Sequence, residues 1–510
     1  MSTPGKIVVV GGGLAGITAA IALREVGADV TLVEARPRLG GATTSFSRGG
    51  LVVDNGQHVF LRCCVAYRGL LARLGMTGSV ALQDRFDVTV LGPGGRARLR
   101  RTALPGPLHM GQALVGYRFL SRAQRLRVGR AALAMAALNP AREDLDRQRL
   151  GDWLAAHGQD EQTRRLLWDL FTVSALNVAG DDANLALAAT VVKTALLGAR
   201  DAADIGVPGI PLGDLHGRAA GEHLARIGAQ VRLGAKAAAV EVLPGAPGGP
   251  GASGARFRVR LAGRPGGDDP PESAGLVLEA DGVVLAVPPA VAAKLAPAGL
   301  GRGPAAGDMP GPAQWRELGT SPIVNVHVIY DRRVTRLPFV AAVDSPVQWV
   351  FDRTGPSGLR SGQYLAVSLS AADAYVDVPA SALRKQFLPA MADLLPAARE
   401  ARVTDFFVTR ERRATLRQVP GCERLRPGAA TALPGLVLAG AWTDTGWPDT
   451  MEGAVRSGLN AVRVLRQELA APGRAGLVAG PAGSPGAVNG SGPADRPVPA
   501  GGSAGTGATA

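Results

Sequence analysis

The chain has 510 residues, of which 46% are hydrophobic, so it is long enough for two or three domains with large buried cores. It contains three cysteines, Cys63, Cys64 and Cys422, which excludes a disulfide scaffold and fits a cytoplasmic protein. The net charge of +14 comes from scattered arginines without a long run of like charges, and we therefore predict no nucleic-acid partner.

The first 35 residues predict a strand at Ile7–Val10, a glycine turn, a helix at Leu14–Val26 and a second strand at Val30–Val33. A strand–helix–strand unit of this kind belongs to a parallel sheet. We therefore interpret the apolar run near the N-terminus as this unit and not as a signal peptide. No other segment predicts a transmembrane helix.

A G-x-G-x-x-G pattern fills the predicted turn and opens the helix. The first glycine permits the tight turn, the second lets the backbone approach a pyrophosphate, and the third lets helix and strand pack closely. The free N–H groups at the helix N-terminus attract phosphate, and an acid after the second strand accepts hydrogen bonds from a ribose. This pattern predicts a dinucleotide site at Gly11, Gly13, Leu14, Ala15, Gly16 and Glu34.

The stretch that follows this acid reads E-A-R-P-R-L-G-G over Glu34–Gly41. It resembles the flavin-containing amine oxidase and carotenoid desaturase superfamily, which implies FAD as the cofactor, with Ala35, Arg36, Gly40 and Gly41 beside it. One position departs from the amine oxidases, since Ala42 stands where they often carry arginine.

Residues 60–205 are expected to be mostly helical. Within them, residues 104–141 mix apolar residues with five arginines and lack a sharply segregated apolar face, so a membrane-surface segment and a helical cap on a substrate domain both stay open. Strand patterns return at Arg256–Leu261, Val283–Val287 and Ile323–Tyr330, and they continue over residues 337–375.

A second motif near the C-terminus consists of a strand at Leu436–Ala439 and a helix from about Thr450 to Leu469. The segments L-V-L-A-G-A-W-T-D and T-M-E-G-A-V-R-S-G match the last flavin motif of the superfamily. A helix N-terminus placed there stabilises negative charge on a reduced flavin. The resemblance implies that Asp444, Glu452, Gly453 and Ala454 contact FAD.

Four shorter segments, Asp54–Leu61, Ala175–Asn177, Pro208–Leu212 and Gly446–Glu452, resemble the hydroxysqualene dehydroxylase family of bacterial hopanoid synthesis. The likeness spans residues 5–466. It implies reductive removal of a hydroxyl from a long-chain isoprenoid, with an external reductant for FAD and with an anionic membrane surface as a further partner at the inner face. A carotenoid or polyene desaturase and a non-enzymatic flavin carrier are the alternatives.

Several other polar residues have simpler structural interpretations. We favour a His58 that is tied to a backbone carbonyl over an acid near the flavin, and a solvated Lys193 over a catalytic one. Cys63 and Cys64 are interpreted as small buried residues. No Cys or His lies in a flavin-attachment context, so FAD is expected to bind non-covalently. No pattern marks a proton donor or a metal site.

The fold is predicted to be α/β, with a Rossmann-like FAD-binding domain of the glutathione-reductase type and an inserted mixed α+β substrate domain. The FAD domain is assigned to residues 1–60, 206–295 and 400–470, and the substrate domain to residues 61–205 and 296–399. Residues 471–510 are mostly Gly, Ala, Pro and Ser, which predicts a disordered tail.

Overall fold

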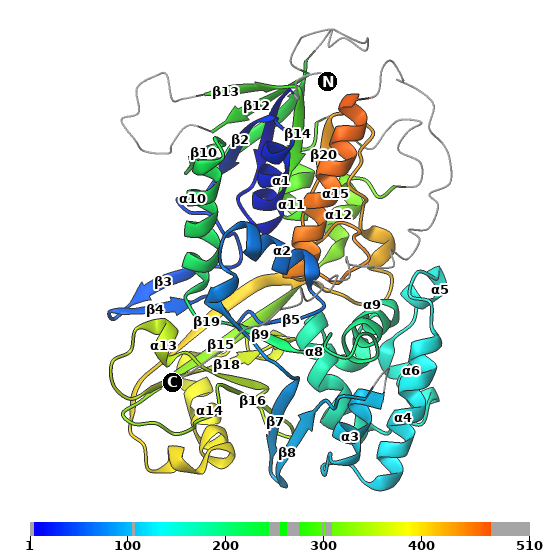
Figure 1. Ribbon diagram of the computed structural model, residues 1–510, viewed down its shortest axis with the longest axis vertical. Helices are drawn as coiled ribbons and strands as arrows, with labels where there is room; N and C mark the ends of the chain where they lie inside the picture. Colours follow the sequence, from blue (N-terminus) through cyan, green and yellow to red (C-terminus); the bar gives the residue numbers. More distant parts are fainter. Residues whose placement is uncertain are drawn as a thin grey trace, which may run out of the picture.

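The computed structural model describes residues 5–104, 108–243, 256–262, 275–297, 300 and 309–470 (Figure 1). The predicted tail at residues 471–510 lies outside the described part of the chain.

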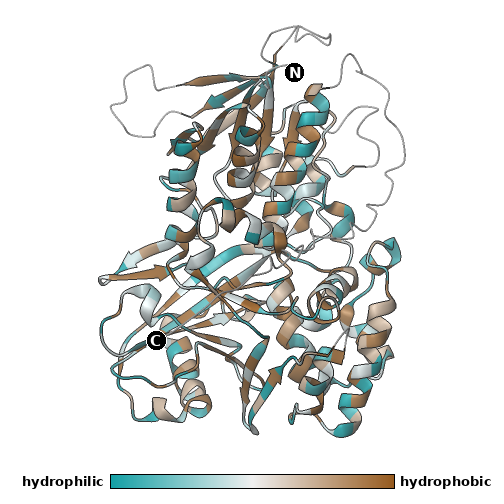
Figure 2. Ribbon diagram, viewed as in Figure 1, coloured by the Kyte–Doolittle hydropathy of each residue, from teal (hydrophilic) through white to brown (hydrophobic). Residues whose placement is uncertain are grey.

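A five-stranded parallel sheet contains both predicted nucleotide-binding segments. Its strands occur in the order β10 (Gln230–Leu233), β2 (Asp29–Glu34), β1 (Lys6–Val10), β14 (Gly282–Leu285) and β20 (Leu436–Leu438). The central strands are apolar almost throughout, as Figure 2 shows, because both faces of the sheet are covered. Segments far apart in sequence therefore meet on one sheet, and the α/β expectation is confirmed.

Helices cover one face of this sheet, and a small antiparallel sheet covers the other. On the helical face, Val9, Val284 and Val437 pack against α1 (Leu14–Glu25), α2 (Val65–Arg73), α10 (Ala219–Arg226) and α15 (Met451–Ala470). On the opposite face, Val8 and Val283 pack against β11 (Ala237–Val242), β12 (Phe257–Leu261), β13 (Val277–Ala280) and α11 (Pro289–Leu295). Because the strands are parallel, the carboxyl ends of β1 and β20 lie at the same edge of the sheet, and α1 and α15 follow these two strands in the chain.

A seven-stranded mixed sheet forms the other half of the molecule (Figure 1). Its strands occur in the order β19 (Val403–Leu416), β15 (Thr320–Tyr330), β18 (Gln363–Leu369), β17 (Trp349–Asp352), β16 (Phe339–Ala342), β7 (Asp87–Gly92) and β8 (Gly95–Arg100). Valines of β15 on one face pack against α14 (Ala380–Leu394).

The other face of this sheet packs against a layer of short helices. They are α3 (Leu108–Val115), α4 (Arg122–Ala137), α5 (Glu143–Asp146), α6 (Leu150–Ala156), α7 (Glu161–Thr163), α8 (Asp169–Leu176) and α9 (Leu185–Val191).

Short strands and helices connect the two halves. They are β3 (Ser45–Arg48), β4 (Leu51–Asp54), β5 (Phe60–Leu61), β6 (Val80–Leu82), β9 (Ile205–Pro208), α12 (Pro312–Trp315) and α13 (Thr354–Ser357).

Two expectations differ from the structure. The region of residues 60–205 is not mostly helical at its start, since β5, β6, β7 and β8 all lie between residues 60 and 100. β5 and β6 pair with β9, β7 pairs with β16, and β8 pairs with β7 in a hairpin. The domain boundaries stay a prediction, but β19, which falls in the stretch 400–470, pairs with β15 of the seven-stranded sheet.

Candidate functional site

The glycine turn after β1 has the geometry of a phosphate site. Gly11 has a φ of +110°, and a Cβ there would lie 2.2 Å from the carbonyl oxygen of Ala286. A Cβ on Gly16 would lie 1.9 Å from the carbonyl oxygen of Gly11. Both positions therefore require glycine for packing, as predicted for a tight turn and a close helix–strand contact.

Gly13 differs, because a Cβ there would meet only the Cα of Gly41, at 3.9 Å. Gly13 is the N-cap of α1, no side chain caps this helix, and the first turn at Leu14 and Ala15 is buried. Buried N–H groups at an uncapped helix N-terminus require an acceptor, and a phosphate supplies one. The turn therefore fits the pyrophosphate of a dinucleotide.

The second predicted segment packs directly on the first. Gly40 donates its N–H to the carbonyl of Gly12 at 2.9 Å, and a Cβ on Gly41 would lie 2.9 Å from the Cα of Gly13. Gly40 and Gly41 both have positive φ, at +102° and +57°. We call Gly11–Gly16 together with Gly40–Gly41 the glycine cradle.

Glu34 lies at the end of β2, beside the cradle. Its Oε2 accepts the N–H of Gly12 and its Oε1 accepts the N–H of Arg36, both at 2.7 Å. The exposed Arg36 side chain donates to the carbonyl of Gly41 at 3.2 Å, and Ala35 is exposed. The structure thus gathers every predicted N-terminal residue at one place, and their contacts with FAD stay a prediction.

Asn55 connects the cradle to the seven-stranded sheet. Its Nδ2 donates to the carbonyl of Ala42 at 2.8 Å and to Oε1 of Glu411 on β19 at 3.0 Å. Its carbonyl accepts from Nδ2 of Asn325 on β15 at 3.2 Å. Two buried atoms here, Nε2 of Gln57 and Oδ1 of Asn325, have no hydrogen-bond partner among the described residues. We call Asn55, Gln57, Asn325 and Glu411 the Asn55 cluster.

A buried ion pair holds the segment that enters this cluster. Asp54 and Arg353 lie 2.7 Å apart with side chains 5% and 6% exposed, and Asp54 also accepts from the hydroxyl of Ser45. The neighbouring His58 has its Nδ1 3.3 Å from the carbonyl of Gly56, as favoured from the sequence. Burial lowers the pKa of His58, so the neutral imidazole is favoured.

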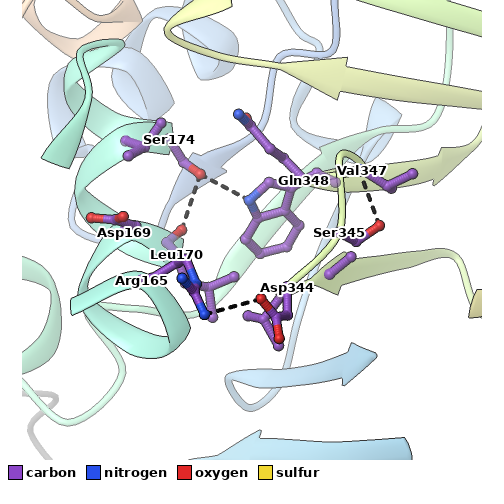
Figure 3. A pocket seen from close by; sticks show the side chains of 12 residues that line it. Arg165, Asp169, Leu170, Ser174, Asp344, Ser345, Val347 and Gln348 are labelled. Atoms are coloured by element: carbon purple, nitrogen blue, oxygen red, sulfur yellow. Dashed lines mark hydrogen bonds and ion pairs between the residues drawn. The ribbon is translucent and has the colours of Figure 1, made fainter. Parts of the chain in front are cut away.

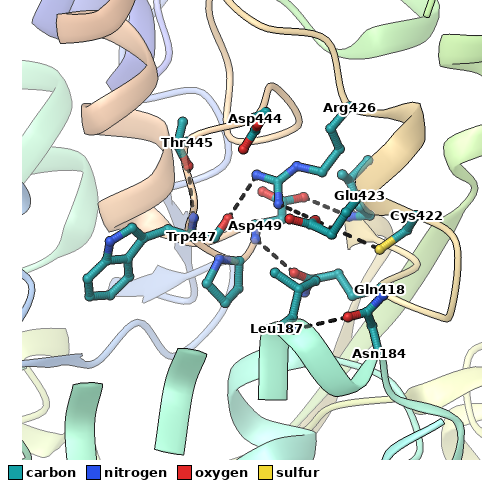
Figure 4. A network of polar contacts seen from close by, with 12 residues as sticks. Asn184, Leu187, Gln418, Cys422, Glu423, Arg426, Asp444, Thr445, Trp447 and Asp449 are labelled. Carbon is teal, nitrogen blue, oxygen red and sulfur yellow. Dashed lines mark hydrogen bonds and ion pairs between the residues drawn. The ribbon is translucent and has the colours of Figure 1, made fainter. Parts of the chain in front are cut away.

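The C-terminal motif is shaped by Arg426, which the sequence analysis did not identify. This buried guanidinium donates through Nη2 to the carbonyls of Ala441, Thr443 and Trp447, and Nη1 donates to Glu423 at 2.6 Å (Figure 4). It thereby fixes the loop between β20 and α15. No local motif surrounds Arg426, so only its contacts in the fold reveal this role.

The predicted residues of this motif have different environments. Glu452 is buried, and its carboxylate accepts the N–H groups of Ala66 and Tyr67 at the start of α2, at 3.2 and 2.8 Å. Its side chain therefore anchors α2. A Cβ on Gly453 would lie 2.5 Å from the carbonyl of Pro448, and Asp444 is exposed. Ala454 lies in the first turn of α15 and packs against the helical core.

Asp449 precedes α15 in the same loop. Its Oδ2 accepts the N–H of Leu416, at the end of β19, at 2.6 Å, and its own N–H donates to Gln418. Burial raises the pKa of this carboxyl, which favours its protonated form. Figure 4 places Asp449 beside the Arg426 network.

A separate pocket of about 360 Å³ lies between α8 and the turn from β16 to β17 (Figure 3). It shares no residue with the glycine cradle. Trp349 lines it and donates its indole N–H to the hydroxyl of Ser174 at 2.8 Å. Trp349 pairs with Ser368, and Ser368 pairs with Asn325, so all three side chains lie on one face of the sheet. The pocket and the Asn55 cluster thus border the same layer.

Two further observations concern what the described residues do not contain. They include no group of three or more His, Cys, Asp or Glu side chains able to hold a metal ion. Among the described helices, none combines the length and apolar character needed to span a bilayer.

Comparison with known proteins places the chain in a family. A family model described as flavin containing amine oxidoreductase matches residues 14–466. The chain is 29% identical over 465 residues to a hydroxysqualene dehydroxylase of Rhodopseudomonas palustris, covering 90% of this chain and 97% of that protein. It is 24% identical to a zeta-carotene desaturase of Synechocystis, with 90% and 97% covered.

Among solved structures, wild-type putrescine oxidase bound to putrescine superposes with a TM-score of 0.63 and 19% sequence identity, covering 91% of this chain and 98% of that one. This likeness supports the fold described above. The chain belongs to the flavin containing amine oxidoreductase family, and it is an FAD-dependent oxidoreductase.

Proposed function

We propose that the protein catalyses FAD-dependent reductive dehydroxylation of hydroxysqualene to squalene. The name of the Rhodopseudomonas relative supports this reaction, and the similarity extends over nearly the whole of both chains. The carotene desaturase relative is matched at lower identity. A squalene-type substrate also agrees with the long-chain isoprenoid substrates named for these relatives.

The proposed cofactor site consists of the glycine cradle, Glu34 and the start of α15. The residues proposed to contact FAD are Gly11, Gly13, Leu14, Ala15, Gly16, Glu34, Ala35, Arg36, Gly40, Gly41, Asp444, Glu452, Gly453 and Ala454. Because the Glu452 carboxylate is hydrogen-bonded to the start of α2, we assign the proposed contact of Glu452 with FAD to its backbone. When bound and reduced, FAD supplies the hydride that replaces the departing hydroxyl group.

One observation supports a hydroxylated substrate over a pure hydrocarbon. Oδ1 of Asn325, on a fully buried residue of β15, lacks a hydrogen-bond partner among the described residues. An unpaired buried polar atom costs about 1–3 kcal/mol. A hydrocarbon leaves that cost unchanged, whereas an alcohol relieves it by donating its O–H to Oδ1 of Asn325.

The chain must also protonate the departing oxygen, because hydroxide is a poor leaving group. That proton leaves with the hydroxyl oxygen as water, while the hydride from reduced FAD takes the place of the hydroxyl group on carbon.

The isoprenoid chain is proposed to occupy the layer between α8 and the face of the seven-stranded sheet that carries Asn325 and Trp349. The pocket at Trp349 forms the outer end of this layer. Partly buried apolar residues, including Phe171 and Val191, border the same helical core. An apolar lining excludes bulk water from the reacting carbon.

Product analysis tests the proposal. The purified protein is photoreduced under anaerobic conditions, incubated with hydroxysqualene and extracted for gas chromatography with mass spectrometry. We expect squalene in proportion to reduced protein, and none with the oxidised form. Consumption of a carotenoid precursor by the oxidised form, with hydroxysqualene left intact by the reduced form, would establish the desaturase alternative.

Two partners complete the proposal. Repeated turnover requires an external reductant for FAD. The very apolar substrate and the net charge of +14 support peripheral association with an anionic membrane surface at the cytoplasmic face.

A further inference from the structure

The segment that forms α3 and α4 is basic and lacks acidic residues. From Thr102 to Arg142 the sequence contains no Asp or Glu, while it contains six arginines, at positions 118, 122, 125, 127, 130 and 142. Two of them are paired with acids from outside this stretch, Arg127 with Asp160 and Arg142 with Asp144. The remaining arginines give this surface a local positive charge.

The helix α4 has two distinct faces. Val128, Ala131 and Met135 are buried in the core beneath the helical layer. Arg122, Leu126, Arg130 and Leu133 recur at helical spacing on the opposite face, and all four are exposed. The helix is therefore a cap over the core on one side and an apolar, basic surface on the other.

The neighbouring helix α3 extends this surface. Leu108 and Val115 point outward from it, and Arg125 of α4 donates to the carbonyl of Val115, which places the end of α3 against α4. We call the exposed side chains of Leu108, Val115, Arg122, Leu126, Arg130 and Leu133 the α3–α4 face.

Exposure distinguishes this face from the rest of the described surface. Val115 is 69% exposed, Leu133 63%, Leu108 61% and Leu126 60%. These are the four most exposed large hydrophobic side chains among the described residues. A water-facing surface gains nothing from them, so four such side chains on two adjacent helices indicate an interaction site.

We propose that the α3–α4 face docks the protein on an anionic lipid bilayer. The leucine and valine side chains enter the boundary between headgroups and acyl chains, while the arginines bind lipid phosphates. A second copy of the chain fits less well, because two acid-free basic faces repel each other. The proposal extends the membrane association proposed above by assigning its surface.

Vesicle binding without substrate tests the assignment, so its failure leaves the dehydroxylation assay unaffected. The full FAD-loaded chain is sedimented with vesicles of phosphatidylcholine containing one-third phosphatidylglycerol, and with pure phosphatidylcholine vesicles. We expect preferential binding to the anionic vesicles that weakens as salt rises. R122Q/R130Q should weaken this binding by on the order of tenfold or more.

Apolar variants and matched control variants distinguish binding through the α3–α4 face from binding through the net charge of the protein. L126S/L133S should weaken binding at every salt concentration, because the penetrating groups are lost. R399Q/R412Q removes two exposed charges elsewhere, each of them paired with an aspartate, and L233S/V242S removes two exposed apolar groups elsewhere. Both controls should bind like the wild type.

The proposal would be overturned if the wild type did not bind anionic vesicles, or if the control variants weakened binding as much as the α3–α4 variants. It would also be overturned if the wild type sedimented as a dimer that L126S/L133S dissociates. Flavin content and circular dichroism verify that each variant is folded.

Discussion

The glycine cradle and the Asn55 cluster lie next to each other but depend on sequence in opposite ways. The cradle is built from backbone, and its residues fall within the first 41 positions. The Asn55 cluster is built from side chains, and Asn55, Asn325 and Glu411 come together only because β15 and β19 pair beside the loop after β4. Local motifs specify the cofactor site, whereas strand register specifies the wall beside it.

The largest effect is expected at the cradle. Gly13→Val should fold, because a Cβ at this position meets nothing nearer than 3.9 Å, but its side chain fills the space in front of α1. We expect loss of bound flavin, measured by absorbance of the purified protein. Gly69→Val in α2, where a Cβ also meets no atom within 4 Å, should keep its flavin. Equal flavin content in both variants would contradict the assignment.

The ion pair behind the Asn55 cluster should give the next largest effect. Arg353→Leu leaves the buried Asp54 carboxylate without its charged partner, and such a loss typically lowers the free energy of unfolding by about 3–5 kcal/mol. Urea unfolding measures the change. Arg399→Gln, at an exposed pair, should change stability by less than about 1 kcal/mol. A similarly small effect of Arg353→Leu would show that the pair is not a structural anchor.

Asn325→Leu separates stability from function within the cluster. It removes the buried Oδ1, which has no partner among the described residues, and the Nδ2 that donates to the Asn55 carbonyl, so we expect a loss of stability of about 1–3 kcal/mol, whereas kcat/KM for hydroxysqualene should fall by about 10- to 100-fold. Thr404→Ala, on β19 away from the cluster, serves as the control. Unchanged kcat/KM in Asn325→Leu would show that Asn325 is not part of the substrate site.

A pH-dependent effect concerns the pocket at the other end of the sheet face. Burial raises the pKa of Asp169 to about 6. A carboxyl with a raised folded-state pKa stabilises the fold below its unfolded pKa, and this contribution is lost as pH rises from about 4 to about 6. Asp169→Asn should therefore gain stability relative to wild type over this range, by about 3 kcal/mol at most. Parallel unfolding curves at pH 4 and pH 7 would contradict this.

The sequence predicted the parallel sheet and the cradle because glycine spacing and β-branched runs act over a few residues. It did not identify Arg426, whose carbonyl partners lie 15 to 21 positions away and carry no residue signature. The sequence analysis did not single out Asn325, because its partner Asn55 lies 270 positions away and is brought to it only by the fold. The strands β7 and β8 were missed although they pair locally as a hairpin across residues 92–95, because the region from residue 60 to 205 was assigned mostly to helix.

The direction of hydride transfer tests the central claim most directly. Reduced protein is mixed anaerobically with hydroxysqualene in D₂O, where the transferable hydrogen of the flavin exchanges with solvent. The account predicts one squalene per flavin reoxidised, with deuterium at the former carbinol carbon and the oxygen released as water. Bleaching of the oxidised protein by squalene or a carotenoid precursor, with no reaction of the reduced protein, would contradict it.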